Sequence, residues 1–376
     1  MKNTIDVRKH IHANPELSGL EMNTSKFIFK TLKELGFNKF HQGFSMYSFV
    51  VEINGKESGS TLLFRCELDA LPIYEKNNLP HSSIHEGISH KCGHDGHIAI
   101  MLDFAQKLIT NPILKGKILL FFQSAEETGA GARGAIESGI FDQFSIDYAF
   151  ALHNMPGFPM SSILAKENQF TPCVESGIFE LIGHTSHASE PQKGINPALA
   201  IAEIITFFDS LIKADKSNEN YFLCTPIHID MGEKAYGTSA GKATVSYTFR
   251  TWKNDKFDNM KIQIEHKISQ IAGKHHLILN TSWIQTFNAN NNHPEAYQII
   301  KQAAKLTNFP IIDLEKPFEF GEDFGLFTKK YKGAMFGVGS GINQPPLHNA
   351  DFDFPDELIE VGSSMFYQIS NQLLNE

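Results

Sequence analysis

The chain has 376 residues, and its hydrophobic content of 41% is ordinary for a folded protein. Its formal net charge is −9 and no run of Lys or Arg is long enough for a nucleic-acid footprint, so nucleic acid is not an expected partner. No apolar run approaches the roughly 20 residues of a membrane span, and the first residues lack the apolar core of a signal peptide, so we expect no membrane contact. Four widely spaced cysteines are typical of a reduced, cytoplasmic protein and not of a disulfide framework.

The first half of the chain alternates short apolar runs with amphipathic stretches. Residues 24–35 carry apolar groups at helical spacing and stop at Gly36, a residue type that commonly follows a helix. Strands are predicted at residues 47–53, 61–64, 118–122 and 148–152, and helices at 97–109 and 132–138. Strands that alternate with helices favour an α/β sheet with parallel pairs, in which ligand sites gather at the carboxyl ends of the strands.

The pattern changes from about Glu175 onward. The predicted elements are a strand at 176–182, a helix at 197–212, strands at 225–231 and 243–251, a helix at 257–272 and a strand at 276–283. This β-α-β-β-α-β order matches a small ferredoxin-like domain. The residues after Pro294 return to the α/β pattern and end in a helix at 355–374.

The length also favours two domains. We therefore predict an α/β fold whose main domain, residues 1–172 and 286–376, has a mixed, mostly parallel sheet flanked by helices. An inserted ferredoxin-like α+β lid domain at residues 173–285 interrupts it.

The densest polar motif is His-Lys-Cys-Gly-His-Asp-Gly-His at residues 90–97. Thiolate, imidazole and carboxylate groups bind zinc and similar divalent metals, and such a cluster is costly to bury unless something pairs with it. The motif therefore indicates a metal site.

A second cluster, Glu126 and Glu127, directly follows the predicted strand at 118–122. Glu67, Asp69 and His153 likewise stand just after predicted strands. Because the carboxyl ends of parallel strands meet at one edge of a sheet, we expect these side chains to converge on the metal site.

With these motifs the chain resembles the zinc-dependent aminoacylase/carboxypeptidase superfamily. The similar branch is that of hippurate hydrolases, N-acetyl-diaminopimelate deacetylases and auxin-conjugate amidohydrolases. The matched segments are residues 8–18, 65–73, 90–97, 121–127, 151–153, 183–188, 321–324 and 346–352. Their order along the chain makes the resemblance specific, whereas any one segment would be modest evidence.

The resemblance implies the metal ligands Cys92, His94, Glu127, His153 and His348, which would hold two divalent ions per subunit, zinc, manganese or cobalt. It also implies that Glu126 is the general base, which takes a proton from metal-bound water and passes it to the leaving amine. Asp69 would orient a ligand, and its alternative is a turn residue before Pro72. His90 and His97 are ligands by type, but the resemblance leaves them outside the ligand set.

In the lid, the resemblance assigns His187 a catalytic and substrate-binding role, in which it polarises the scissile carbonyl, often in the partner subunit. Arg250 would bind a substrate carboxylate, with a surface ion pair as its alternative. Two positions depart from the family pattern: Glu67 stands where Asp is more frequent, and Gly237 stands where an Asn is usual. Thr238 or Ser239 is a candidate to supply the missing amide's hydrogen bond.

The resulting prediction is a metal-dependent amidohydrolase that cleaves N-acyl amino acids or related small amides by attack of metal-bound hydroxide. The main domain would be catalytic and metal-binding, and the substrate a small molecule. Two alternatives stay open: a dipeptidase or other exopeptidase with the same site, and a non-catalytic metal-holding binding protein. The resemblance further implies a homodimer formed through the lid, or a homotetramer.

Overall fold

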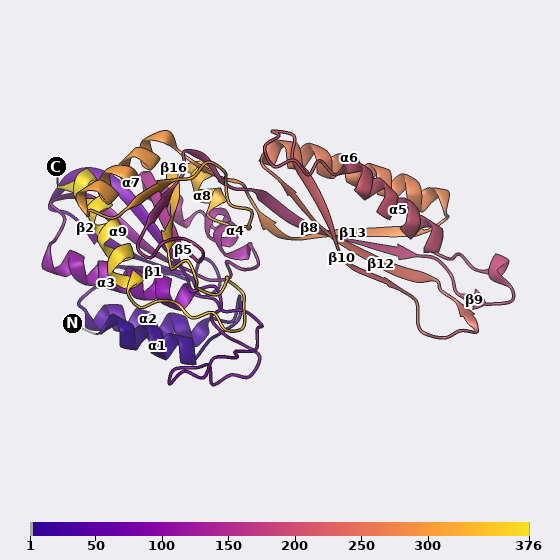
Figure 1. The fold of residues 1–376 in the computed structure, drawn as a ribbon, viewed down its shortest axis with the longest axis horizontal. Helices are drawn as coiled ribbons and strands as arrows, with labels where there is room; N and C mark the ends of the chain where they lie inside the picture. The colour runs from indigo at the N-terminus through magenta and orange to yellow at the C-terminus, as the bar shows by residue number, and fades with distance from the viewer. Residues whose placement is uncertain (1–2, 376) are drawn as a thin grey trace. The chain divides into compact units, whose positions relative to one another are not determined.

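The computed structural model describes residues 3–375, which form two compact units (Figure 1). The large unit comprises Met1–Phe170, Asn290–Pro317 and Glu322–Glu376. The small unit comprises Thr171–Ala289 and Phe318–Gly321. Each unit has its own hydrophobic core.

The large unit is built on one eight-stranded sheet in the order β1-β2-β4-β3-β5-β16-β6-β15. The strands are β1 (Phe40–Gln42), β2 (Phe49–Asn54), β3 (Glu57–Glu67), β4 (Lys115–Gln123), β5 (Ile146–Met155), β6 (Ile163–Ala165), β15 (Ile311–Asp313) and β16 (Lys332–Gly339). The four central strands, β4, β3, β5 and β16, are mutually parallel, whereas β2 and β6 pair with them antiparallel. The carboxyl ends of the central strands therefore share one edge.

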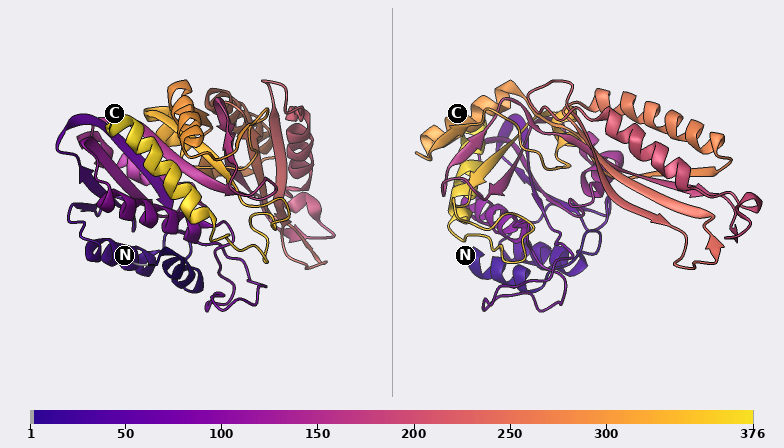
Figure 2. Two further views of the ribbon diagram at one scale, coloured as in Figure 1. Left: turned by 60° about the vertical axis from the view of Figure 1, so that its left-hand side comes forward. Right: turned by 45° about the vertical axis from the view of Figure 1, so that its right-hand side comes forward.

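Helices cover both faces of this sheet, which explains why residues 118–122 of β4 form a continuous apolar run. The helices are α1 (Thr4–Ala13), α2 (Met22–Glu34), α3 (His94–Thr110), α4 (Ala130–Glu137), α7 (Pro294–Leu306), α8 (Gly325–Lys330) and α9 (Leu358–Leu374). On one face α9 lies against α3 (Figures 1 and 2), and Phe64 of β3 contacts Phe104 and Phe366 from these two helices. On the other face Phe121 of β4 contacts Phe327 of α8.

The small unit is a four-stranded antiparallel sheet in the order β10-β12-β8-β13, with two helices packed on one face. Its elements are β8 (Cys173–Ile182), β9 (Ser186–His187), α5 (Ala198–Leu211), β10 (Phe222–Met231), β11 (Thr238–Ser239), β12 (Lys242–Thr251), α6 (Asn254–Lys274) and β13 (Ile278–Phe287). Residues of β12 alternate between buried and less buried, as expected where only one face is covered. Phe179, Phe208 and Phe249 lie in the core beneath the helices.

These observations confirm the predicted fold class, a mixed α/β sheet flanked by helices together with a ferredoxin-like α+β unit. Two placements were wrong: Glu67 is the last residue of β3, and His153 lies inside β5, since both strands extend beyond the predicted runs. Helices α1 and α7 and strand β16 were not predicted.

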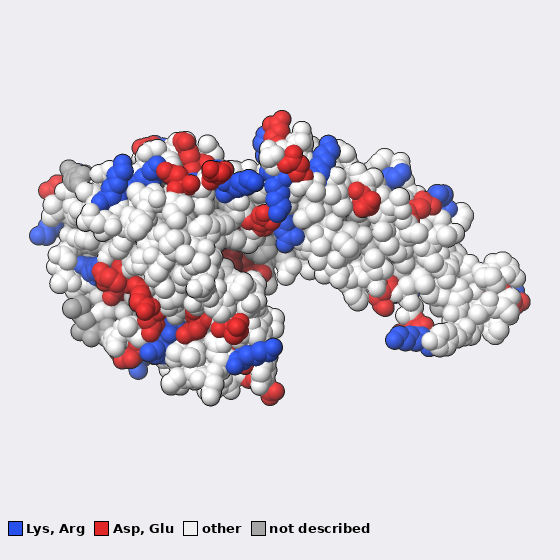
Figure 3. Space-filling model, in the orientation of Figure 1, with Lys and Arg blue, Asp and Glu red and all other residues white. Residues whose placement is uncertain are grey.

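Among the described residues no helix is both long enough and apolar enough to cross a membrane. On the face shown in Figure 3, acidic and basic side chains are interspersed over both units.

Candidate metal centre

The five predicted ligands come from four segments of the large unit. Cys92 and His94 flank Gly93, whose φ of 97° lies in the left-handed region, and α3 begins at His94. A Cβ at position 93 would lie 2.4 Å from Asn154 Oδ1, so only glycine allows this turn between the two ligands. Glu127 follows β4, His153 lies in β5, and His348 lies in the loop that precedes α9.

The structure brings all five side chains together. Cys92 Sγ lies 3.4 Å from His153 Nε2, and Glu127 Oε1 lies 3.9 Å from His94 Nε2 and 3.6 Å from His348 Nε2. Among the groups of ligand atoms whose members all lie within 4.8 Å of one another are Cys92–His94–His153 and Cys92–Glu127–His348. Cys92 belongs to both groups, which suits a thiolate shared by two cations.

Two ligand atoms, unpaired among the described residues, also indicate that this cluster binds a divalent metal. His94 Nε2 and Glu127 Oε1 are buried atoms with no hydrogen-bond partner within residues 3–375. Buried polar atoms are normally paired, so such atoms at the centre of a ligand cluster indicate a ligand-binding role. Burial and the neighbouring Glu127 also raise the pKa of the Cys92 thiol well above its usual value, and a bound cation would favour the thiolate.

Asp69 orients two of these ligands. Its Oδ1 lies 3.1 Å from His94 Nδ1, which leaves His94 Nε2 directed at the cluster. Its Oδ2 accepts hydrogen bonds from the backbone N–H of Glu127 at 2.9 Å and from Ser18 Oγ at 2.7 Å. Although burial opposes it, the contact with His94 lowers the pKa of Asp69. A partner on the far nitrogen is the usual way in which proteins fix a metal-binding imidazole.

Glu126, the predicted general base, is 5% exposed beside the ligand cluster. Burial, then the neighbouring carboxylates Glu322, Asp323 and Glu127, raise the pKa of Glu126 well above its usual range, while Arg65 opposes the change. A carboxylate with increased proton affinity is a better proton acceptor near neutral pH. The residue type and its surroundings therefore suit general-base chemistry.

Glu67 and His97 lie immediately behind the ligands. His97 Nδ1 is 2.7 Å from Glu67 Oε2, and His97 Nε2 is 2.7 Å from Asn154 Oδ1. Arg65, which is fully buried, forms ion pairs with Glu67, Glu322 and Asp323. The glutamate at position 67 thus joins His97 to this buried arginine.

Glu21 supports the same edge of the sheet and was not predicted. Its Oε1 accepts hydrogen bonds from the backbone N–H of Ala125 at 2.7 Å and of Gly19 at 2.8 Å. Ala125 has a φ of 54°, a strained value for a non-glycine residue, and it directly precedes Glu126. Burial and the nearby Asp69 raise the pKa of Glu21 to about 7. The position of Glu21 just after the matched segment 8–18 was the only signal for it in the sequence.

His187 and Arg250 lie in the small unit. His187 is exposed in β9, where its Nδ1 lies 2.7 Å from Ser189 Oγ, and Arg250 is partly buried in β12. The carbonyl of Gly237 accepts a hydrogen bond from Ala188 N–H at 2.9 Å. A Cβ at position 237 would meet no atom within 4 Å, so the fold does not require glycine there. The replacement of the usual Asn by Gly237 therefore changes the side-chain chemistry and not the fold.

Comparison with known proteins decides the family. The model of peptidase family M20/M25/M40 matches residues 63–372. The chain belongs to this family. The match includes all five clustered ligands together with Glu126 and Asp69.

Among curated relatives of this M20 chain, the N-acetyl-L-cysteine deacetylase of Bacillus subtilis is 30% identical over 100% of this chain and 89% of that protein. The N-acetyldiaminopimelate deacetylase of Lactobacillus helveticus is 31% identical over 94% of this chain and 92% of that protein. Among solved structures, the Bacillus subtilis YXEP protein, a dinuclear metal-binding peptidase of the M20 family, has a TM-score of 0.81 and 25% identity over 99% of this chain and 98% of that one.

The M20 chain is therefore a metal-dependent amidohydrolase, as its sequence predicted. Its family and its clustered ligands support two divalent metal ions.

Proposed function

We propose that this amidohydrolase removes the acyl group from N-acyl amino acids or closely related small amides. The observation that carries the proposal is the pair Glu126–Glu127. Glu126 is a buried carboxylate with a raised pKa, and its neighbour Glu127 is one of the clustered metal ligands. A site that only held metal would need the ligands but not the second carboxylate. Deacetylase relatives over nearly the whole chain support the same substrate class.

In this proposal Cys92, His94, Glu127, His153 and His348 hold two zinc, manganese or cobalt ions. When bound, such ions polarise a carbonyl oxygen and lower the pKa of water. Asp69 keeps His94 and the backbone of Glu127 in place.

Glu126 accepts the proton of the attacking water and donates it to the nitrogen of the leaving amine. The C–N bond of the amide breaks as this proton reaches the nitrogen. The second proton of the water, left on the new carboxyl group, passes to the amine or to solvent, and the products are a carboxylate and an amine.

We assign substrate contacts in the small unit to His187 and Arg250. An imidazole aimed at the developing oxyanion stabilises it, and a guanidinium fork matches the carboxylate of an amino acid. Because Gly237 lacks a side chain, Thr238 or Ser239 would supply a nearby hydrogen bond. Ser239 Oγ accepts one from Asn196 Nδ2 at 3.0 Å and keeps its O–H free to donate.

The test is amine release from a panel of N-acetyl amino acids, N-benzoyl amino acids and dipeptides, with Zn²⁺, Mn²⁺ or Co²⁺ supplied. We expect release from the acylated amino acids, abolished by a chelator and restored when metal is added back. Cleavage of dipeptides alone would instead place the chain among the peptidases. Two bound metals without turnover on any substrate would favour a binding protein.

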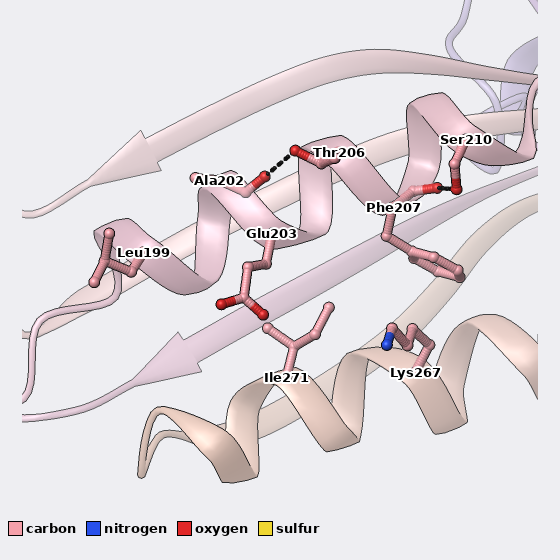
Figure 4. A pocket seen from close by; sticks show the side chains of 8 residues that line it. All are labelled: Leu199, Ala202, Glu203, Thr206, Phe207, Ser210, Lys267 and Ile271. Atoms are coloured by element: carbon pink, nitrogen blue, oxygen red, sulfur yellow. Dashed lines mark hydrogen bonds between the residues drawn. The ribbon is translucent and has the colours of Figure 1, made fainter.

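We further propose a homodimer formed through the small unit. The second half of the edge strand β10 is exposed, with Ile227 at 60% and Ile229 at 41%. A groove between α5 and α6 is lined by Leu199, Phe207 and Ile271 and by the charged residues Glu203 and Lys267 (Figure 4).

An unpaired strand edge and an apolar groove are surfaces that a second copy can cover. Light scattering of the wild type should give a dimer mass, and Ile229→Asp should shift it to the monomer. A wild-type monomer would contradict the proposal, and a tetramer would extend it.

The four cysteines, Cys66, Cys92, Cys173 and Cys224, are all free and buried, which supports a location in the cytoplasm.

A further inference from the structure

Lys91, which stands between His90 and the ligand Cys92, has a side chain that is fully buried in the large unit. Its Nζ lies 2.7 Å from Glu75 Oε1 and donates a second hydrogen bond, also of 2.7 Å, to the backbone carbonyl of Phe352. Burying an ammonium group is costly even when it is paired. An apolar residue of similar size at the same position would usually stabilise the fold at least equally. Such a side chain beside a metal ligand therefore points to a role beyond packing.

The carboxylate that pairs with Lys91 is itself fixed. Glu75 accepts hydrogen bonds from Ser83 N–H at 2.6 Å, and its Oε1 lies 3.0 Å from His12 Nε2. His12 Nδ1 in turn lies 2.9 Å from Asp95 Oδ2 in the first turn of α3. Although burial opposes it, the contacts with His12 and Lys91 lower the pKa of Glu75 to about 2. Lys91 thus belongs to a rigid, charged network anchored on α1 and α3.

The segment 348–352 is the part of the chain that this network holds. The backbone carbonyl of Lys91 accepts a hydrogen bond from His348 N–H at 2.7 Å, while the Lys91 side chain bonds the carbonyl of Phe352. Phe352 O also accepts a bond from Asn77 Nδ2 at 3.1 Å. One residue therefore fixes both ends of the loop that carries His348.

His348 needs this support more than the other ligands do. Its φ of 66° is unfavourable for a residue with a Cβ, and its side chain is 51% exposed. By contrast, His94 begins helix α3 and His153 lies in strand β5, and both are buried. Both groups contain Cys92, which precedes α3 outside any regular element, but only the group Cys92–Glu127–His348 depends on an exposed ligand.

We propose that Lys91 is a positioning residue for His348, and that it sets the cation affinity of the group Cys92–Glu127–His348 while leaving the group Cys92–His94–His153 largely unaffected. The inference rests on the proposed ligand set. It requires that the two cations respond unequally when Lys91 is changed.

The experiment is equilibrium dialysis of the full chain against Co²⁺, with bound metal counted by elemental analysis. Thiolate-to-cobalt absorption provides an independent signal from Cys92. The wild type should bind two ions. Lys91→Met keeps the side-chain length without its charge, and it should weaken one of the two ions by about 10- to 100-fold, the usual cost of losing a partner behind a ligand. The other ion and the thiolate absorption should remain.

Lys76→Met is the matched control. It makes the same chemical change at an exposed side chain next to Glu75, and both cobalt ions should bind as in the wild type. If Lys91→Met fails to fold, Asn77→Ala removes the other side-chain donor to Phe352 O and should weaken the same ion to a smaller extent.

Equal weakening of both ions, or no change in either, would overturn the proposed role of Lys91. A wild type that binds fewer than two ions would overturn the ligand set and the inference with it. A wild type that binds two ions with the predicted inequality, but cleaves no acylated amino acid, would contradict the proposed function alone.

Discussion

The two units of this M20 amidohydrolase place their charged residues differently. The large unit buries ionised side chains behind the strand ends and the metal loop, among them Arg8, Arg65, Asp69 and Lys91. Among the described residues of the small unit, Glu175 is the one acid below 9% exposure. The hydrophobic core of this unit consists of apolar side chains, several of them aromatic.

Buried ion pairs are a weak source of stability, because each ion loses its hydration. Their concentration in the large unit is therefore better explained by chemistry than by folding. The small unit carries its charged side chains mainly at its surface.

The largest effect is expected at Glu126 in the large unit. Glu126→Gln keeps the shape of the side chain but removes its capacity to accept a proton, so kcat on the best substrate should fall by roughly 100-fold or more. Metal content and thermal unfolding should stay at wild-type values. Turnover that is unchanged in a variant with both metals bound would rule out the general-base role.

The next effect is expected on stability, at Arg65. Arg65→Met would leave Glu67, Glu322 and Asp323 buried without their common cation, which should cost about 3–5 kcal/mol in the free energy of unfolding. Urea denaturation provides the measurement. Arg133→Met, at an exposed position of α4, is the control and should change little. A loss below about 1 kcal/mol at Arg65 would contradict its role as the common cation of these carboxyl groups.

The sequence predicted the position of Glu126 but not the ion pairs of Arg65. The run 118–122 predicted a buried strand, and the acids behind it were expected at its carboxyl end, because periodicity and strand polarity are local properties of the sequence. Strand β16 was missed because Lys-Gly-Ala-Met-Phe-Gly-Val-Gly contains three glycines and little that favours a strand.

The supporting charges were missed for another reason. Lys91 bonds a carbonyl 261 positions away, and Arg8 pairs with Asp356 at a separation of 348. No local pattern reports such pairs, and a lone Lys or Arg in a sequence is usually a surface residue. Glu21 was missed because its role is to hold the backbone of Ala125, whose strained φ is visible only in the structure.

A smaller effect, dependent on pH, is expected at Glu52, on β2 of the large unit and away from the metal centre. Although burial opposes it, bonds from Lys117 and His41 lower the pKa of Glu52 to about 2. A carboxylate with a lowered pKa stabilises the fold above its unfolded pKa of about 4.3, and this stabilisation is lost as pH falls through the folded value.

Glu52→Gln should therefore cost about 1–2 kcal/mol at pH 7 and nearly nothing close to pH 2. Thermal unfolding of both proteins across this range measures the difference. A cost that does not shrink as pH falls would contradict the role of the charge.

The smallest effect is expected in the small unit, at Lys253. Its Nζ lies 3.4 Å from Glu219 Oε2, and the two side chains are 60% and 75% exposed. Exposed pairs gain little from their attraction, because water and salt screen it and both side chains lose conformational freedom. Lys253→Ala should change the free energy of unfolding by no more than about 0.5 kcal/mol, and added salt should not alter the result. If urea denaturation instead gave a loss comparable to that of Arg65→Met, breaking an exposed pair in the small unit would cost as much as leaving buried carboxylates of the large unit without their cation, and the contrast between the units would fail.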